Sequence, residues 1–204
     1  MKTIGITGGV GCGKSKVLEY INNNYNCLII LADDIGNKVK EPGNACYDEL
    51  ISILGMGVLN NDGMIDKKKM ADMIFNDELL LQRVNNVIHP AVEKYFIELK
   101  DQTKEKGIID YFFIEAALLI ECGYRKHVDE LWYIYADERV RRQRLKESRG
   151  YSDSKIDSIM SAQLSEEQFR QSCDRVIDNS KELIETYKQI DEFMRIIGEN
   201  SGRQ

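Results

Sequence analysis

The sequence predicts an α/β fold built on a parallel β-sheet with helices on both faces. Short runs rich in β-branched and aromatic residues recur along the chain, and long stretches with helical periodicity separate them. Strands that alternate with helices favour a parallel sheet, because each crossover helix covers one face of it. We expect five strands, at Thr3–Thr7, Cys27–Leu31, Ile108–Ile114, Leu131–Tyr135 and Arg175–Ile177.

Composition and charge exclude several classes of protein. A chain of 204 residues can bury a self-sufficient core, and its net charge of −6 argues against a general nucleic-acid or polybasic membrane binder. The five cysteines form no CxxC pair, which argues against a disulfide framework or a zinc site and favours a reducing compartment. The longest apolar run, Tyr111–Ile120, is too short to span a membrane. We expect a cytoplasmic monomer or weak homo-oligomer without nucleic-acid or membrane partners.

A glycine-rich loop follows the first strand. Gly8–Ser15 matches the pattern G-x-x-x-x-G-K-[ST] and precedes a helical stretch. Glycines let successive N–H groups converge on one anion, and the positive end of the next helix adds to the attraction. Lys14 is predicted to reach the β- and γ-phosphates of ATP or GTP, and the Ser15 hydroxyl to ligate Mg²⁺. The predicted contacts are Gly8, Gly9, Val10, Gly11, Cys12, Gly13, Lys14, Ser15 and Lys16.

Two acidic residues follow or end neighbouring strands, at the edge where parallel sheets bind ligands. Asp33 comes after the second strand and is predicted to take or orient a hydroxyl proton, the alternative being an N-cap of the next helix. Asp34 is expected to face solvent. Glu115 ends the third strand, and two roles stay open for it: holding Mg²⁺ through water, or orienting a substrate amide. Cys12 lies at a helix N-terminus, so a redox-sensitive thiolate is a further hypothesis.

Two long insertions interrupt the alternation of strands and helices. Residues 33–106 are too long for a simple crossover, and we expect several short helices there that bind a substrate. His89-Pro90 is predicted to open one of them, with Pro90 in the first turn. Residues 137–173 are predicted to be helical, with Ser152 and Ser165 as N-caps.

Positive charge concentrates within the second insertion. Residues 139–149 are rich in basic side chains, with Glu147 as the one acid: Arg139, Arg141, Arg142, Arg144, Lys146 and Arg149. A solvated helix face is one interpretation. The other is a mobile lid whose arginines stabilise the charge on a transferring phosphoryl group and exclude water.

Ordered sequence blocks resemble the dephospho-coenzyme A kinase family over residues 4–179. They are Ile4–Ser15, Ala32-Asp33, Glu41–Gly43, His89-Pro90, Leu118–Glu121, Arg144-Leu145, Ala162-Gln163 and Asp174–Asn179. The chain departs from the family's pattern at Leu31, where Asp is usual, at Glu115–Ala117 in place of Asp-x-Pro, and at Ser148-Arg149 in place of Arg-Asp.

The resemblance implies transfer of the γ-phosphoryl group of ATP to the ribose 3′-hydroxyl of dephospho-CoA, the last step of coenzyme A synthesis. It implies a P-loop kinase core of five parallel strands at about residues 1–32, 107–136 and 174–204. It also implies a helical substrate-binding insert at about 33–106 and a lid at about 137–173. By similarity, Asp33 is the base or hydroxyl-orienting group, His89 contacts the substrate, and Arg142 and Arg144 grip phosphate. Asn179 is an expected ATP contact, and the loop after it is expected near the adenine.

Two rival functions share the loop. A regulatory GTPase would need a guanine-reading N-K-x-D motif, and Asn37-Lys38-Val39-Lys40 fails at its last residue. Another small-molecule kinase, acting on a nucleoside or nucleotide, keeps the same chemistry and changes only the acceptor. It is the alternative that the sequence leaves open.

Overall fold

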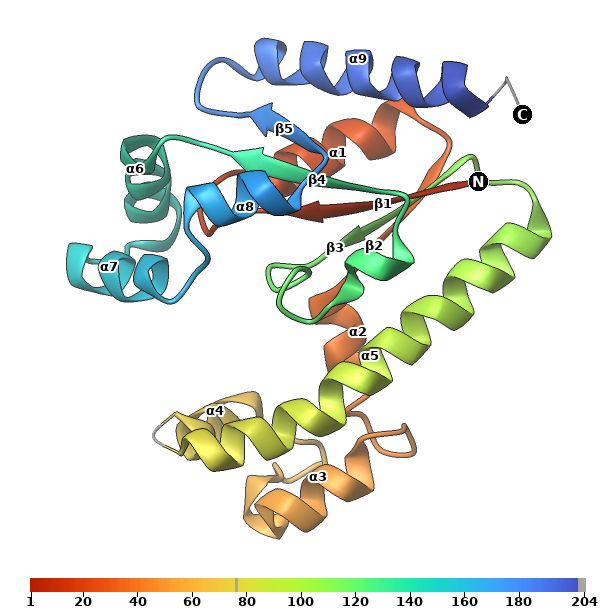
Figure 1. The fold of residues 1–204 in the computed structure, drawn as a ribbon. Coiled ribbons are helices and arrows are strands. Elements are labelled where there is room, and N and C mark those ends of the chain that lie inside the picture. Colours follow the sequence, from red (N-terminus) through yellow and green to blue (C-terminus); the bar gives the residue numbers. More distant parts are fainter. Residues whose placement is uncertain (76, 202–204) are drawn as a thin grey trace. The chain divides into compact units, whose positions relative to one another are not determined.

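The computed structural model describes residues 1–75 and 77–201 of the protein. The chain divides into two compact units (Figure 1). One consists of residues 1–29 and 109–204, and the other consists of residues 30–108.

The predicted five-stranded parallel sheet is confirmed. Its strands are β1 (Lys2–Thr7), β2 (Cys27–Leu31), β3 (Tyr111–Glu115), β4 (Glu130–Tyr135) and β5 (Arg175–Asp178). Their order is β2-β3-β1-β4-β5, and β1 pairs in parallel with β3 and β4. The third strand begins at Tyr111 rather than at the predicted Ile108, which is exposed.

Successive side chains of a strand point to opposite faces of the sheet, and in β1, β3 and β4 most of them are buried. Helices therefore cover both faces. On one face, α1 (Lys14–Asn24) contacts α9 (Leu183–Ser201), and both pack over the strands, whereas α8 (Glu166–Ser172) contacts β4 on the other (Figure 1). The core under α1 and α9 joins apolar side chains of both helices to those of β1, β3, β4 and β5. Its members include Ile4, Ile6, Val17, Ile21, Phe113, Trp132, Ile134, Ile177, Ile190 and Met194.

The predicted helical stretch between β4 and β5 is divided into three helices. After α6 (Glu138–Arg149) comes α7 (Asp153–Ser161), which packs against it, and then α8. The two predicted N-caps are confirmed. Ser152 accepts a hydrogen bond from the Lys155 amide, and Ser165 forms a full capping box with Gln168. A short 3₁₀ helix, η2 (Tyr124–His127), precedes β4.

Residues 30–108 form a helical unit around one long helix. The shorter helices α2 (Ala32–Lys38), α3 (Tyr47–Leu54) and α4 (Lys67–Ile74) each pack against α5 (Glu78–Lys106), and η1 (Met56–Val58) contacts α3 (Figure 1). Asp66 and Asp77 cap α4 and α5 through bonds to backbone amides. No helix among residues 1–75 and 77–201 is long and apolar enough to cross a membrane.

Pro90 corrects one prediction. It lies inside α5, twelve residues past Glu78 at the start of the helix, and does not open a helix of its own. A proline there removes one backbone hydrogen bond, to the Asn86 carbonyl, and disfavours the turn before it. The helix continues because Val84, Val92 and Phe96 are buried on both sides of the proline. Tertiary packing therefore outweighs the local penalty.

Candidate active site

The glycine-rich loop connects β1 to α1. Gly13 is the N-cap of α1 in the left-handed region, with φ 90°, and it has no side chain with which to cap the helix itself. A Cβ at Gly13 would collide with the side-chain amide of Asn179. The first turn of α1 thus keeps the positive end of the helix for an external anion, which fits the predicted phosphate site.

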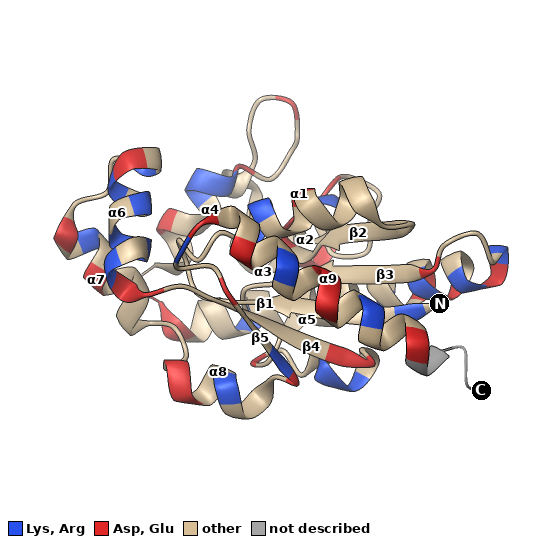
Figure 2. Ribbon diagram, turned by 90° about the horizontal axis from the view of Figure 1, so that it is seen from above, with Lys and Arg blue, Asp and Glu red and all other residues tan. Residues whose placement is uncertain are grey.

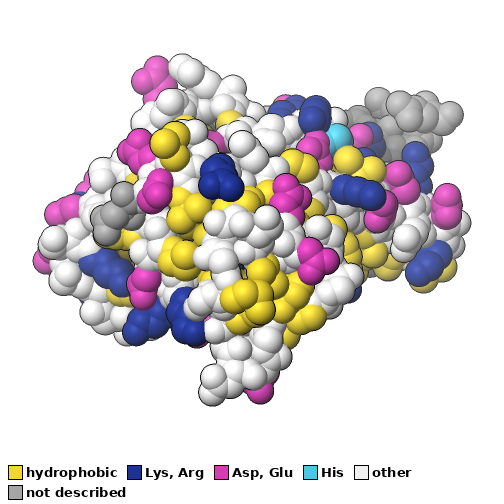
Figure 3. All heavy atoms as spheres, turned by 90° about the horizontal axis from the view of Figure 1, so that it is seen from below, with side chains coloured by type: hydrophobic (Ala, Val, Ile, Leu, Met, Phe, Trp, Pro, Cys, Tyr) yellow, Lys and Arg dark blue, Asp and Glu magenta, His cyan; other side chains and the backbone are white. Residues whose placement is uncertain are grey.

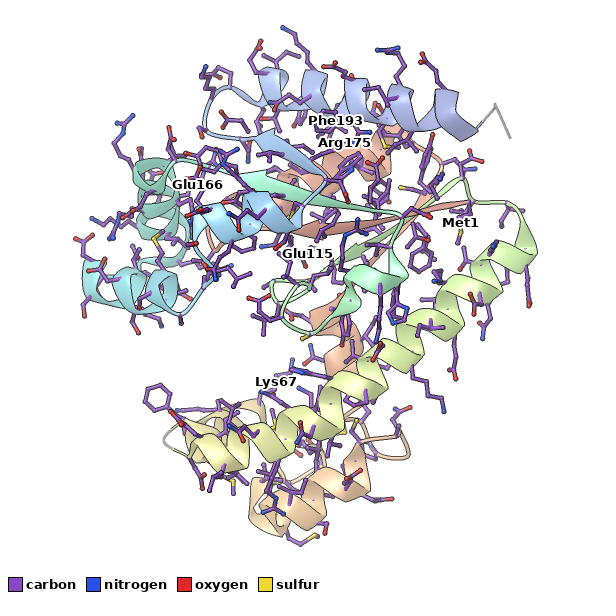
Figure 4. The ribbon with its side chains drawn as sticks, in the orientation of Figure 1. Met1, Lys67, Glu115, Glu166, Arg175 and Phe193 are labelled. Atoms are coloured by element: carbon purple, nitrogen blue, oxygen red, sulfur yellow. The ribbon has the colours of Figure 1, made fainter. Side chains whose placement is uncertain are left out.

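Lys14 and Glu115 meet beside this loop. Glu115 ends β3 (Figure 4), and its register partner in β1 is Ile6, two residues before Gly8. The Lys14 ammonium donates to the Gly8 carbonyl at 2.8 Å and lies 3.5 Å from Glu115 Oε1. Both side chains are about 15% exposed, so the ammonium is held over the loop in a partly desolvated setting. Ser15, the next residue of α1, is exposed.

Asn179 is hydrogen-bonded to the backbone of the loop. It follows β5 directly, is 1% exposed, and donates through Nδ2 to the Cys12 carbonyl at 2.8 Å. Thr186, at the start of α9, fixes the orientation of this amide by donating to its Oδ1 at 3.0 Å. Arg144 of α6 joins them, because its guanidinium donates to the Cys12 carbonyl at 3.3 Å and to the Asn179 carbonyl at 2.9 Å.

Arg141 is a loop contact that the sequence analysis did not single out. Its Nε donates to the Val10 carbonyl at 2.9 Å, and its Nη2 donates to Gln163 Oε1 at 3.0 Å. A signal for it exists in the sequence. Val140 and Leu145 are the apolar residues of α6, and at 100° per residue both Arg141 and Arg144 fall on the helix face between them.

Arg142 points elsewhere. Its guanidinium donates to Glu138 at 2.7 Å and to Asp157 of α7 at 2.5 Å, and its Nη1 lies 3.9 Å from Asp153. Blue basic positions on α6 and red acidic ones on α7 are visible in Figure 2. The two arginines predicted to grip phosphate therefore differ: Arg144 contacts the loop, whereas Arg142 joins α6 to α7.

Asp33 and His89 belong to the helical unit. Leu31 is the N-cap of α2, so Asp33 lies in the first turn of that helix with an exposed side chain, and Asp34 is exposed as predicted. Asp33 also raises the pKa of the half-buried Lys40, but burial and repulsion by Lys67 outweigh this and lower it overall. His89 is half-buried in α5, and burial lowers its pKa, so the imidazole is neutral at pH 7.

Cys12 is not poised as a thiolate. Its side chain is 2% exposed, and burial raises the pKa of the thiol although the charges of Lys14 and Arg141 oppose this. The raised pKa favours the protonated thiol at neutral pH, which argues against the redox hypothesis for this residue.

The residues around the loop fit Mg²⁺ in the way that phosphate-transfer sites usually hold it. Mg²⁺ prefers hard oxygen ligands and is commonly bound by one or two protein oxygens together with substrate phosphates and waters. Ser15 offers a hydroxyl in the first turn of α1, and Glu115 offers a carboxylate at the end of the strand beside β1. The described residues contain no group of three or more His, Cys, Asp or Glu side chains that would form a protein-only cage.

Known proteins are similar to this chain in sequence and in fold. The family described as "Dephospho-CoA kinase" matches residues 2–185. A dephospho-CoA kinase from Aquifex aeolicus is 35% identical over 190 residues, which cover 93% of this chain and 94% of the relative. A solved protein of Thermus thermophilus has a TM-score of 0.80 at 24% identity, covering 95% and 96% of the two chains. The dephospho-CoA kinase structure of Campylobacter jejuni has a TM-score of 0.73 at 20% identity, covering 98% and 100%. These two structures share the fold, and the match of sequence over nearly the full length shows that this chain belongs to the dephospho-CoA kinase family.

Proposed function

We propose that this protein transfers the γ-phosphoryl group of ATP to the ribose 3′-hydroxyl of dephospho-CoA and releases CoA and ADP. The observation that carries the proposal is the phosphate loop with Lys14 held over it, in a chain that matches the family from residue 2 to 185. Phosphoryl transfer needs little covalent help from a protein, so positioning and charge neutralisation supply most of the catalysis.

The residues around the phosphate loop in the core unit have distinct roles in this proposal. The loop amides and the N-terminus of α1 bind the β- and γ-phosphates, and Lys14 neutralises charge that develops on the transferring group. Arg144 supports the loop and adds positive charge beside it. Ser15 would hold Mg²⁺, which when bound lowers the charge on the phosphate oxygens. Glu115 would either hold the ion through water or orient a substrate amide. Asn179 holds the loop and leads into the segment proposed to border the adenine.

Asp33 is the proposed base or hydroxyl-orienting group. It stands two residues beyond the end of β2 along the chain, and its carboxylate is exposed rather than used as a helix cap. An aspartate that accepts the proton of the attacking hydroxyl is a recurrent part of kinase sites. His89 is proposed to contact the substrate as a neutral imidazole.

The helical unit of residues 30–108 is proposed to bind dephospho-CoA. Hydrophobic side chains gather on the face drawn in Figure 3, and the large exposed hydrophobic residues of this unit include Met56, Phe75 and Leu79. Lys67 (Figure 4) and the half-buried Lys40 are close enough to repel each other, which favours an anionic group as their partner. Apolar and cationic surface together suit a ligand with an organic arm and phosphates.

The remaining predictions stay part of this proposal. Residues 137–173 are proposed to act as a lid that closes over ATP and excludes water. The protein is proposed to work in the cytoplasm as a monomer or weak homo-oligomer.

An acceptor panel tests the function. Purified protein with ATP and Mg²⁺ is given dephospho-CoA, adenosine, AMP or shikimate, and ADP release is followed by a coupled assay. We expect acceptor-dependent ADP release with dephospho-CoA alone. Faster release with a nucleoside or nucleotide would instead identify another small-molecule kinase.

A further inference from the structure

We propose that Arg141 and Gln163 form a linked pair that positions the first arm of the phosphate loop, so that Arg141 is a positioning residue for binding the phosphate chain of ATP. This inference rests on the proposed function, whose nucleotide site it deepens. Three separate segments converge here: the loop itself, α6, and the turn between α7 and α8.

Two successive peptide groups of the loop are held by this pair. The N–H of Val10 donates to Gln163 Oε1 at 3.1 Å, which fixes the peptide between Gly9 and Val10. The carbonyl of Val10 accepts from Arg141 Nε at 2.9 Å, which fixes the peptide between Val10 and Gly11. Arg141 and Gln163 also bond to each other at 3.0 Å, so each side chain holds the other in place.

A hydrogen bond that orients a backbone carbonyl also orients the N–H of the next residue, because both belong to one peptide group. In a planar trans peptide the N–H lies opposite the C=O. With its carbonyl turned to Arg141, the Val10–Gly11 peptide directs the Gly11 N–H away from that guanidinium. The same holds at Cys12, whose carbonyl is held by Asn179 and Arg144, so the Gly13 N–H points away from those side chains. With α6 packed against the loop, as in this structure, the two sets of contacts orient alternate amides of an anion-binding loop.

The glycines of the loop make room for the contact with Arg141. The guanidinium of Arg141 covers Gly9 so closely that a Cβ there would collide with it. A Cβ at Gly11 would lie 2.9 Å from the backbone carbonyl of Arg141 itself. Glycine at these positions therefore serves the approach of α6 as well as the approach of phosphate.

The contacts of Arg141 require a side chain that donates two hydrogen bonds in different, fixed directions. One guanidinium donates through Nε to the loop and through Nη2 to Gln163, in two fixed directions. A lysine at this position would keep the positive charge but would present it as a single point on a flexible stem. Arg141→Lys therefore separates the effect of the positive charge from the effect of the two directed hydrogen bonds.

The experiment measures binding by calorimetry, in the presence of Mg²⁺, for three probes: ATP, tripolyphosphate and AMP. The variants are Arg141→Ala, Arg141→Lys and Gln163→Ala. Arg195→Ala, which removes an exposed arginine of α9, is the matched control. We expect the Kd for ATP and tripolyphosphate to rise about tenfold in all three variants, since each loses hydrogen bonds that orient the loop. AMP binding and the control should stay near wild type.

Three results would overturn the proposal. Wild-type tripolyphosphate binding by Arg141→Lys would show that charge alone matters. An equal loss of AMP affinity would show general damage to the site. Unchanged binding by Gln163→Ala would show that the pair is not coupled. Because these measurements use no acceptor, they decide the role of Arg141 even if the wild-type protein binds ATP and fails to phosphorylate dephospho-CoA.

Discussion

In the core unit, Lys14 is the side chain proposed to act on the transferring phosphate. Its ammonium is held between the Gly8 carbonyl and Glu115 in a partly buried setting, where a charge contact is stronger than in water. Glu115 thus has a visible partner, although its two predicted roles, with Mg²⁺ or with a substrate amide, both remain predictions.

Replacing Lys14 by alanine should lower kcat for ADP release about a hundredfold or more, because a preorganised charge at the transferring phosphate is lost. Thermal melting should show the variant folded. Lys188→Ala, which removes an exposed lysine of α9, is the matched control and should retain activity. Near-normal turnover by Lys14→Ala would refute its role at the phosphate.

Asp33 and Asp34 provide an internal comparison, since both are exposed acids in the first turn of α2. Asp33→Asn should lower kcat by about a hundredfold or more and leave the KM for ATP near its wild-type value, as expected for a proton acceptor. Asp34→Asn should change neither. Steady-state kinetics with varied ATP decide this, and an equal effect of the two substitutions would point to a shared influence on the helix.

Single residues also show what the sequence could not resolve. The loop motif predicts a phosphate site, because Gly13, Lys14 and Ser15 follow the spacing of a phosphate-binding loop. In α6, the apolar face places Arg141 beside the loop, but the turn of Arg142 to α7 depends on how α7 packs against α6, which no local pattern gives. The burial of Cys12, which disfavours its thiolate, depends on tertiary packing and leaves no mark in the sequence.

At the scale of elements, β5 is tied to β4 by a partly buried ion pair. Arg175 donates to both carboxylate oxygens of Glu130, at 2.6 and 3.1 Å, and its guanidinium stacks 4.9 Å from the ring centre of Phe193 on α9 (Figure 4). Burial raises the pKa of Glu130, but the bonds from Arg175 and Trp132 outweigh it and hold this pKa below its ordinary value. The pair therefore joins the edge strand β5 to β4 of the core.

Arg175→Met should destabilise the protein by about 2 kcal/mol at pH 7, because it removes charged hydrogen bonds and leaves Glu130 partly buried. This corresponds to a fall in Tm of about 4–8 °C. A depressed folded-state pKa contributes stability above the unfolded pKa, and this contribution is lost as the pH falls through the folded value. The gap in Tm between variant and wild type should accordingly narrow in acid.

Arg195→Met is the control for this prediction. Arg195 and Glu199 form an exposed pair within α9, with a single bond of 2.7 Å, and such pairs contribute little to stability. Equal losses of Tm for the two variants, or a gap for Arg175→Met that does not change with pH, would contradict the proposed role of the β5 pair.

The helices include features that follow from the local sequence and one feature that depends on tertiary packing. Ser152 and Ser165 cap their helices as the sequence predicts, because capping depends on residues within one turn. Pro90 does not follow its local preference. Helix α5 buries apolar residues before and after the proline, and that burial is a property of the folded unit rather than of the dipeptide.

For the whole molecule, the order of strands and helices was predictable because period, turn residues and the loop motif all agree. The five strands lie within a few residues of their predicted positions. The insertion at residues 33–106 is expected from its length alone, because it is too long for a simple crossover. Its packing as a compact unit over residues 30–108 depends on which helices share a core, and composition marks no boundary there. The function of residues 30–108 consequently stays a proposal.

The chemical identity of the product tests the central claim most directly. The protein is incubated with ATP, Mg²⁺ and dephospho-CoA, and the product is examined by ³¹P NMR with proton correlation. We expect one new phosphomonoester signal coupled to the ribose H3′ proton, formed in equal amount with ADP. Release of ADP with inorganic phosphate, or a phosphate attached at another hydroxyl, would contradict the proposed transfer.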